Sequence, residues 1–167
     1  MRNRIGPGST RKHAVRPSAR RQPPTCGGGW PPAAGEIDYA LARNPELPAT
    51  GQPRVPAVTR YRRLVCHEWP FSDGRRPSSR CALMEVEPLS GRRHQVRRHF
   101  KHLAHPLIGD STHGKGPFNR AVAAWLGVQR LWLHATTLVL PAWGTRPPLT
   151  LDAAAGPEWH PLFAPHE

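Results

Sequence analysis

The amino-acid sequence predicts an α+β fold, in which a mixed, mostly antiparallel sheet carries helices. Two strand-like runs, 58–69 and 80–88, flank the turn-rich sequence S-D-G-R-R-P-S-S, as in a β-hairpin with a long charged loop. Residues 93–104 and 118–126 instead place their apolar side chains at helical spacing. The nearly continuous apolar run 131–140 is typical of a central, buried strand. Together these patterns favour one domain with helices on a sheet.

The first 29 residues have a different composition from the rest. They are rich in Arg and Pro, contain three consecutive glycines, and offer only Ile5 and Val15 to a hydrophobic core. Such a segment cannot offset the entropy lost on ordering, so we expect residues 1–29 to be disordered. The globular part is expected to span residues 30–167.

The globular part begins with a strand and a loop. Residues 35–41 (G-E-I-D-Y-A-L) alternate polar and apolar side chains, which predicts a half-buried strand. Residues 44–57 are rich in Pro and are predicted to form a loop before the hairpin.

Two helices follow the hairpin. In residues 93–104, Val96, Phe100 and Leu103 make an apolar stripe, and Ser90 is the predicted N-cap. The second helix, 118–126, is expected to end at Gly127 as its C′ residue. A short strand and a helical turn around Trp159 are predicted within residues 149–163.

The charge of the chain indicates a polyanionic partner. Its net charge is +13, from 24 Lys and Arg against 11 Asp and Glu. Most of the basic residues are arginines, whose planar guanidinium suits phosphate and nucleobases, although an Arg-rich coding bias explains this preference equally well. The three cysteines form no C-x-x-C pair, which favours reduced thiols and a cytoplasmic location. No apolar run or signal peptide indicates a membrane partner.

The most basic stretch of the globular part lies between Glu87 and Asp110, where no acidic residue occurs. A small-residue turn leads into the predicted helix 93–104 and then into an apolar bend that ends at Gly109-Asp110. Basic side chains at the start of a helix are suited to holding phosphates, so nucleic acid is the first partner to consider. The basic residues of this stretch, apart from histidines, are Arg92, Arg93, Arg97, Arg98 and Lys101.

The same stretch resembles a known family. Its L-S-G-R-R-H-Q-V-R-R-H and H-P-L-I-G-D-S-T-H-G are similar to the T-G-R-x-H-Q-I-R-x-H and P-I-x-G-D-x-x-Y-G motifs of the RluA-type RNA pseudouridine synthases. The later R-L-W-L-H-A-T-T-L-V-L-P resembles the family's L-L-H-A strand, and residues 35–43 and 57–64 also match. Within the family, the likeness is greatest to the branch that modifies tRNA. It covers residue 30 to the C-terminus, so residues 30–167 are expected to be the C-terminal portion of a catalytic domain.

The resemblance implies that uridine in RNA, here tRNA, is isomerised to pseudouridine without a cofactor. In the family an Asp in an H-R-L-D motif is essential, and a Tyr in a K-x-Y motif stacks on the flipped base. Arg97 corresponds to the family's H-Q-[IV]-R arginine and would pair with that Asp, which a neighbouring guanidinium keeps ionised. The residues expected to contact RNA are Arg92, Arg93, His94, Gln95, Arg98 and Lys101.

The chain departs from the family in its acidic residues. None of its aspartates, Asp38, Asp73, Asp110 and Asp152, follows H-R-L, and no K-x-Y occurs. Asp110 is expected to be a turn or cap residue. Two explanations are open: truncation or a reading-frame error that removed the N-terminal half of an enzyme, or a short relative that binds RNA without modifying it. We expect the first, with this copy inactive, because loss of early strands would expose sheet edges that natural proteins avoid.

Other functions are less well supported by the sequence. Five histidines within residues 94–113 spread around the predicted helix instead of following the tight spacing of a zinc site, so we expect no metal. Trp69, Trp125 and Trp132 lie at apolar positions, which favours core packing over stacking on bases. We expect the chain to be a monomer.

Overall fold

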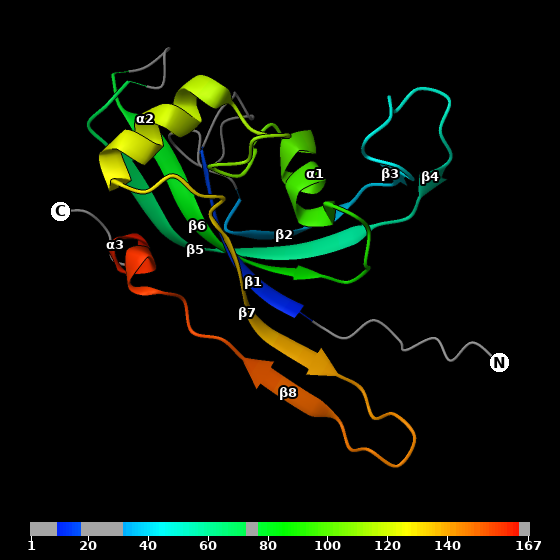
Figure 1. Cartoon of the computed structure of the whole chain (residues 1–167). Coiled ribbons are helices and arrows are strands. Elements are labelled where there is room, and N and C mark those ends of the chain that lie inside the picture. The colour runs from blue at the N-terminus through cyan, green and yellow to red at the C-terminus, as the bar shows by residue number, and fades with distance from the viewer. Residues whose placement is uncertain (1–9, 18–31, 73–76, 164–167) are drawn as a thin grey trace.

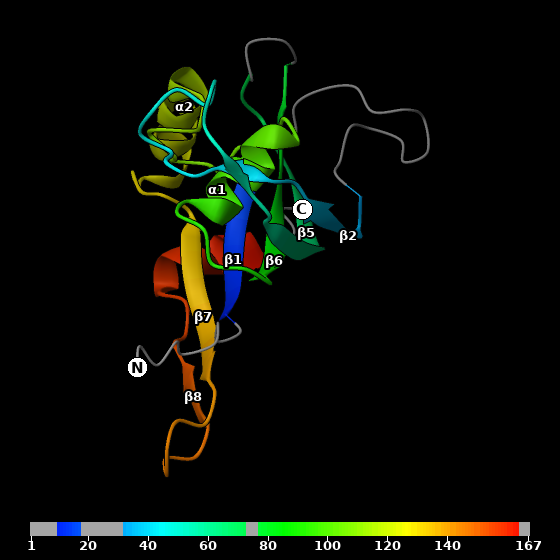
Figure 2. The same ribbon diagram turned by 90° about the vertical axis from the view of Figure 1, so that its right-hand side faces the viewer.

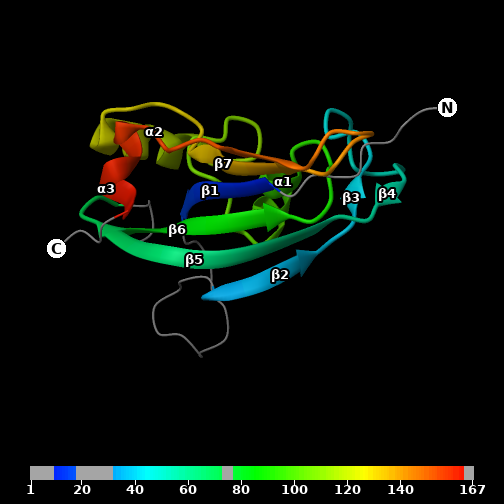
Figure 3. The same ribbon diagram turned by 90° about the horizontal axis from the view of Figure 1, so that it is seen from below.

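The computed structural model describes residues 10–17, 32–72 and 77–163, and for residues 10–17 the backbone only. These residues form a six-stranded sheet in the order β2-β5-β6-β1-β7-β8, with every neighbouring pair antiparallel, as Figure 3 shows from below for most of the strands. The strands of this sheet are β1 (Thr10–Pro17), β2 (Ala34–Asp38), β5 (Val58–Trp69), β6 (Ser79–Pro88), β7 (Leu133–Leu140) and β8 (Leu149–Asp152).

Helices α1 and α2 lie on the same side of the sheet in Figure 1, and a small two-stranded ribbon lies beside α1. The remaining elements are β3 (Leu41–Ala42), β4 (Arg54–Val55), α1 (Gln95–His102), α2 (Gly116–Leu126), the 3-10 helix η1 (Pro157–Trp159) and α3 (His160–Phe163). The α+β class and the mostly antiparallel sheet are therefore confirmed.

Most of the predicted elements are present near their expected bounds. The hairpin of β5 and β6 matches the predicted strands almost residue for residue. Helix α2 ends where predicted, because Gly127 adopts the left-handed conformation, with φ 69°, that glycine accepts without strain. The prediction that residues 131–140 form a central, buried strand is wrong in position and burial: β7 lies next to the edge strand β8 and is half-buried, in a part of the sheet that extends beyond the helices (Figure 1).

The prediction that residues 1–29 are disordered is wrong for residues 10–17, which form β1; the others lie outside the described residues. Strand β1 pairs with β6 on one side and β7 on the other, as Figure 2 shows. Helices α1 and α2 connect β6 to β7 and leave a slot between these two strands. A strand in that slot satisfies backbone N–H and C=O groups on both sides, and this pairing outweighs an unfavourable local composition.

Helix α1 begins two residues later than predicted, and Ser90 is not its N-cap. The N-cap residue is His94, which has a left-handed backbone with φ 54° and makes no capping hydrogen bond with its side chain. The hydroxyl of Ser90 instead donates to Oε1 of Gln95 and accepts the N–H of Val58, so it joins α1 to the start of β5. The predicted apolar stripe is correct: Val96 and Phe100 are buried and Leu103 packs beside them.

Two hydrophobic clusters hold the helices on the sheet. One joins α1 to β2, β5 and β6 and includes the fully buried Phe100 and Met84. The other brings Trp159 and Leu162 from the C-terminal helices together with α2 and the far end of the hairpin. Trp69 and Trp132 are in this second cluster as predicted, whereas Trp125 is 45% exposed and the prediction that it is a core residue is wrong.

None of the helices in the described ranges has the length and apolar content that crossing a bilayer requires.

Candidate functional site

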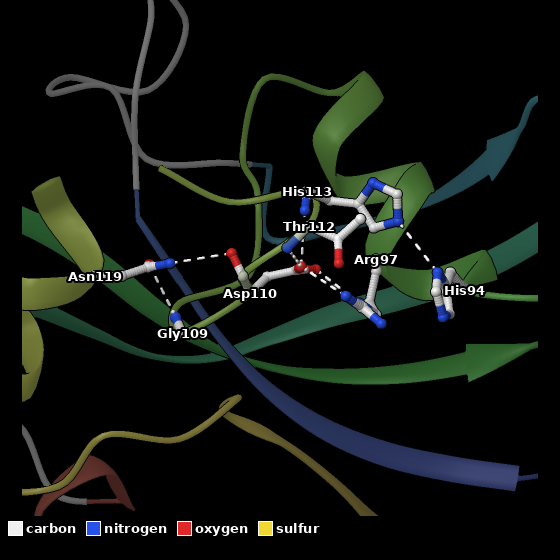
Figure 4. Close-up of polar contacts among 7 residues, drawn as sticks. All are labelled: His94, Arg97, Gly109, Asp110, Thr112, His113 and Asn119. Atoms are coloured by element: carbon white, nitrogen blue, oxygen red, sulfur yellow. Dashed lines mark hydrogen bonds and ion pairs between the residues drawn. The ribbon is translucent and has the colours of Figure 1, made fainter. Parts of the chain in front are cut away.

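The central feature of the site is an ion pair between Arg97 on α1 and Asp110 in the bend before α2 (Figure 4). The guanidinium binds the carboxylate through two hydrogen bonds, Nε to Oδ2 at 2.8 Å and Nη2 to Oδ1 at 2.7 Å. The Asp110 side chain is fully buried and that of Arg97 is 16% exposed. Parallel contacts of this kind fix both the position and the plane of the guanidinium.

Asp110 also organises the bend in which it lies. Its Oδ1 accepts the backbone N–H groups of Thr112 at 2.9 Å and His113 at 2.8 Å, so the expectation that Asp110 is a turn or cap residue is confirmed. Asn119 of α2 accepts the N–H of Gly109 and donates to the carbonyl of Asp110 (Figure 4). Gly109 itself has φ +75°, and a Cβ there would lie 1.7 Å from the carbonyl oxygen of Arg130, so the bend admits only glycine.

The charges of this pair are mutually stabilised. Burial by itself would raise the pKa of Asp110, but the hydrogen bonds from Arg97 and from the N–H groups of His113 and Thr112 outweigh it and lower the pKa below its ordinary value. The hydrogen bond to Asp110 raises the pKa of Arg97. Within the described residues, Nη1 of Arg97 has no hydrogen-bond partner, so the fixed guanidinium keeps one side available for a second anion.

Two histidines lie beside the ion pair. Nε2 of His113 lies 3.3 Å from Nδ1 of His94, and the two rings meet edge to face (Figure 4). Burial is the largest cause of a lowered pKa at both residues, and the positive charge of Arg97 lowers both further. The lowered pKa values favour the neutral form of both rings, in which one ring nitrogen can donate to the other. In the family motif P-I-x-G-D-x-x-Y-G, which this bend resembles, a Tyr occupies the position of His113.

Gln95 has a structural place in the site. It is buried, and its amide oxygen accepts from Ser90 and from the N–H of Arg92, while its nitrogen donates to the carbonyl of Val58 and to Thr59. Both the oxygen and the nitrogen of the Gln95 side-chain amide therefore have hydrogen-bond partners within the protein. Gln95 thus holds the turn before α1, and the structure does not offer its side chain to RNA.

The other predicted RNA-contacting residues lie around α1. Arg92 is exposed and donates from Nε to the carbonyl of Pro56, and Arg93 forms an exposed ion pair with Glu46. Arg98 donates to the carbonyl of Ala42, and Lys101 is exposed. Arg92, Arg93 and Lys101 are thus accessible and Arg98 partly so, but the structure contains no RNA and their contacts with it stay predictions.

The pairing of Arg97 with Asp110 was not predicted, because 13 positions separate the two residues and only the fold brings them together. The pairing of Arg97 with a catalytic Asp of an H-R-L-D motif stays a prediction, since the chain has no such motif. In the described part of the chain, no group of three or more His, Cys, Asp or Glu side chains is placed to hold a metal ion.

Sequence comparison relates the chain to enzymes called tRNA pseudouridine synthase C. It is 42% identical to the one from Pectobacterium carotovorum over 130 residues, 75% of this chain and 35% of the relative. It is 38% identical to that from Vibrio cholerae over 81% of this chain and 58% of the relative, and 40% identical to that from Salmonella typhimurium over 78% and 52%. The chain thus spans between about a third and three-fifths of the length of these curated relatives. No family model matches the chain.

Solved structures with a similar fold carry related names. Human RNA Pseudouridylate Synthase Domain Containing 1 aligns with a TM-score of 0.63 at 19% identity, over 89% of this chain and 55% of the human chain. Human RNA Pseudouridylate Synthase Domain Containing 4 aligns with a TM-score of 0.56 at 22% identity, over 93% and 62%. The fold, the ordered motifs and the sequence identity agree. The chain belongs to the RluA-type RNA pseudouridine synthase family and is similar in sequence to its tRNA pseudouridine synthase C branch.

Proposed function

We propose that this chain is the C-terminal, RNA-contacting part of a pseudouridine synthase domain that acts on tRNA. The observation that carries the proposal is the Arg97 guanidinium of the H-Q-V-R motif, whose Nε and Nη2 both donate to Asp110 while its Nη1 stays available. The exposed basic residues Arg92, Arg93 and Lys101 surround the same helix. A rigid arginine beside a basic surface is suited to hold one anion precisely and several phosphates more loosely.

The reaction would convert a uridine of tRNA into pseudouridine without a cofactor. The N1–C1′ bond breaks, the uracil turns, and C5 bonds to C1′, while the proton on C5 is lost and N1 gains one. The target base must leave its stack, which requires the backbone on either side to be held. Arg97 would orient and keep ionised the carboxylate that starts this chemistry, through the side of the guanidinium that Asp110 does not use.

The chain by itself is expected to bind tRNA without modifying it, because neither the H-R-L-D nor the K-x-Y motif occurs in its sequence. The test is to incubate the purified chain with an unmodified tRNA transcript and to measure both binding and pseudouridine content. Binding with no pseudouridine is the expected result. Pseudouridine formed by this chain would show that another of its residues acts as the nucleophile, and absence of binding would contradict the proposed function.

A non-catalytic RNA-binding module is the second candidate, and the absence of the two catalytic motifs favours it. The two candidates differ in what a completed domain would do. If residues 1–31 are replaced by the N-terminal part of a tRNA pseudouridine synthase C relative, a synthase half should support turnover, whereas an independent binding module should not. Because tRNA is the proposed partner, we place this function in the cytoplasm, and we expect a monomer, which light scattering would check.

A further inference from the structure

A pocket of about 370 Å³ lies between α1 and the segment 39–55, which carries β3 and β4 and which we call the arm. Figure 1 shows the arm beside α1, at the end of the molecule away from α3. Both elements line the pocket. The residues that matter here are Tyr39 and Arg54 from the arm, Arg98, Lys101 and His102 from α1 and its last turn, and His113 from the bend after Asp110.

The lining of this arm–α1 pocket is strongly basic. It contains three permanent cations, Arg54, Arg98 and Lys101, and neither Asp nor Glu. Within the described residues none of these three cations forms an ion pair. By contrast, other arginines of the described chain are paired with carboxylates, for example Arg60 with Glu36 and Arg62 with Glu85. Three cations without a counter-ion around one small cavity will attract an anion.

Two of the three cations, Arg54 and Arg98, are held in place before any ligand arrives. Nη1 of Arg54 donates to the Tyr39 hydroxyl at 2.9 Å and to the carbonyl of Ala40 at 3.0 Å. Nη2 of Arg98 donates to the carbonyl of Ala42 at 2.9 Å. The Arg54 bonds lie within the arm, whereas the Arg98–Ala42 bond and the ion pair of Arg93 with Glu46 fasten the arm to α1 and the turn before it. Fixed donors lose little entropy when they bind a ligand, which favours a specific anion site over a diffuse charged surface.

The aromatic groups of the pocket favour a phosphate over a nucleobase. The ring of His102 stacks on that of Tyr39 with 3.6 Å between ring centroids, and the Arg54 guanidinium lies over the Tyr39 ring at 5.3 Å. The Tyr39 ring is therefore already in contact with two partners, and the His102 ring occupies one of the faces on which a base could stack. Arginine and lysine donors without ion pairs remain the main binding groups, and phosphate oxygens are their natural acceptors.

We propose that the arm–α1 pocket binds one backbone phosphate of the RNA strand, with Arg54, Arg98 and Lys101 as its cationic ligands. This rests on the proposed function, because it assigns that function a specific subsite. His102 and His113 line the same pocket and would report its occupancy. Burial and the charge of Arg54 lower the pKa of Arg98, and a bound phosphate would offset the second of these causes.

The test compares the Arg54→Gln/Lys101→Gln double variant with wild type in binding to a tRNA over a series of salt concentrations. Loss of one phosphate contact should weaken binding about fivefold near 150 mM salt and reduce the salt slope by about one unit. The matched control is Arg146→Gln, an exposed residue of the β7–β8 hairpin, which removes one charge far from the pocket and should leave the slope unchanged. Lys101→Gln alone removes no hydrogen bond within the described residues, so it gives the same readout if Arg54→Gln disturbs the arm.

In a second experiment, wild type is titrated with inorganic phosphate and with uridine monophosphate, and the ring resonances of His102 and His113 are followed by NMR. Saturable shifts that the double variant abolishes are expected. If wild type binds tRNA and the double variant binds it equally well with an unchanged slope, the proposed subsite is wrong and the proposed function stands. If phosphate shifts the histidine resonances but the double variant binds tRNA as wild type does, the pocket binds free phosphate only and the proposal fails. If wild type does not bind tRNA, the proposed function fails first and the RNA subsite with it.

Discussion

Replacing Asp110 with Asn should destabilise the chain by about 3 kcal/mol, because it breaks a buried ion pair while leaving the turn intact. An Asn at this position keeps an oxygen for the N–H groups of Thr112 and His113, which both bind Oδ1. Its amide nitrogen, however, would face the Nε donor of Arg97 in place of Oδ2. The loss is expected at the lower end of the range for buried pairs, since Arg97 is 16% exposed and can regain some hydration.

The measurement is urea unfolding of both proteins at pH 7, followed by circular dichroism. Glu36→Gln is the control, because it breaks an exposed pair with Arg60, whose side chains are 47% and 58% accessible, and should cost less than about 1 kcal/mol. The pH dependence of the wild type supplies a second check. The lowered pKa of Asp110 contributes stability that is present above the pKa of the unfolded carboxyl and is lost as pH falls through the folded value. Equal effects of Asp110→Asn and Glu36→Gln would refute the claim that the Arg97–Asp110 pair organises the site.

Three further predictions follow from the same region. Gly109→Ala should cost at least about 3 kcal/mol, because φ is +75° and the new Cβ would meet the carbonyl of Arg130, whereas Gly127→Ala, with nothing within 4 Å, should cost only about 1–2 kcal/mol in the same unfolding assay. Lowering the pH from 7 to 5.5 should reduce stability, because the pKa values of His94 and His113 are lowered in the folded chain and the unfolded chain takes up protons first; the His94→Gln/His113→Gln variant should reduce this dependence. Binding to tRNA should weaken steeply with salt, with a log–log slope of about −2 or steeper for three or more phosphate contacts, and a flat response would contradict the phosphate-binding role.

The sequence predicts the elements of the fold well where a local pattern and the tertiary structure agree. The β5–β6 hairpin is indicated by two strand-like runs around a turn-rich sequence, and the end of α2 is indicated by Gly127; both signals lie in the residues themselves. Strand β1 is different, because it is stabilised by backbone pairing with β6 and β7, and side-chain composition carries no signal for this.

The site is predictable in part for the same reason. The family motifs identify Arg97 and the Gly109-Asp110 bend, but the contact between them depends on the way in which α1 packs on the sheet. Gln95 belongs to the same motif as Arg97 but is buried. The spacing of the motif residues does not indicate which of them is buried and which is exposed. The arm–α1 pocket joins Arg54 to Lys101 across 47 positions of sequence, so no local pattern indicates it.

The most direct test of the account is the pseudouridine content of a tRNA transcript after incubation with the completed domain. In this protein, residues 1–31 are replaced by the N-terminal part of the Pectobacterium relative, which must also supply a strand for the slot that β1 fills between β6 and β7. The completed domain should form pseudouridine, and Arg97→Gln in that background should abolish turnover while tRNA binding persists. A completed domain that folds and binds tRNA but forms no pseudouridine, or one whose turnover survives Arg97→Gln, would contradict the account.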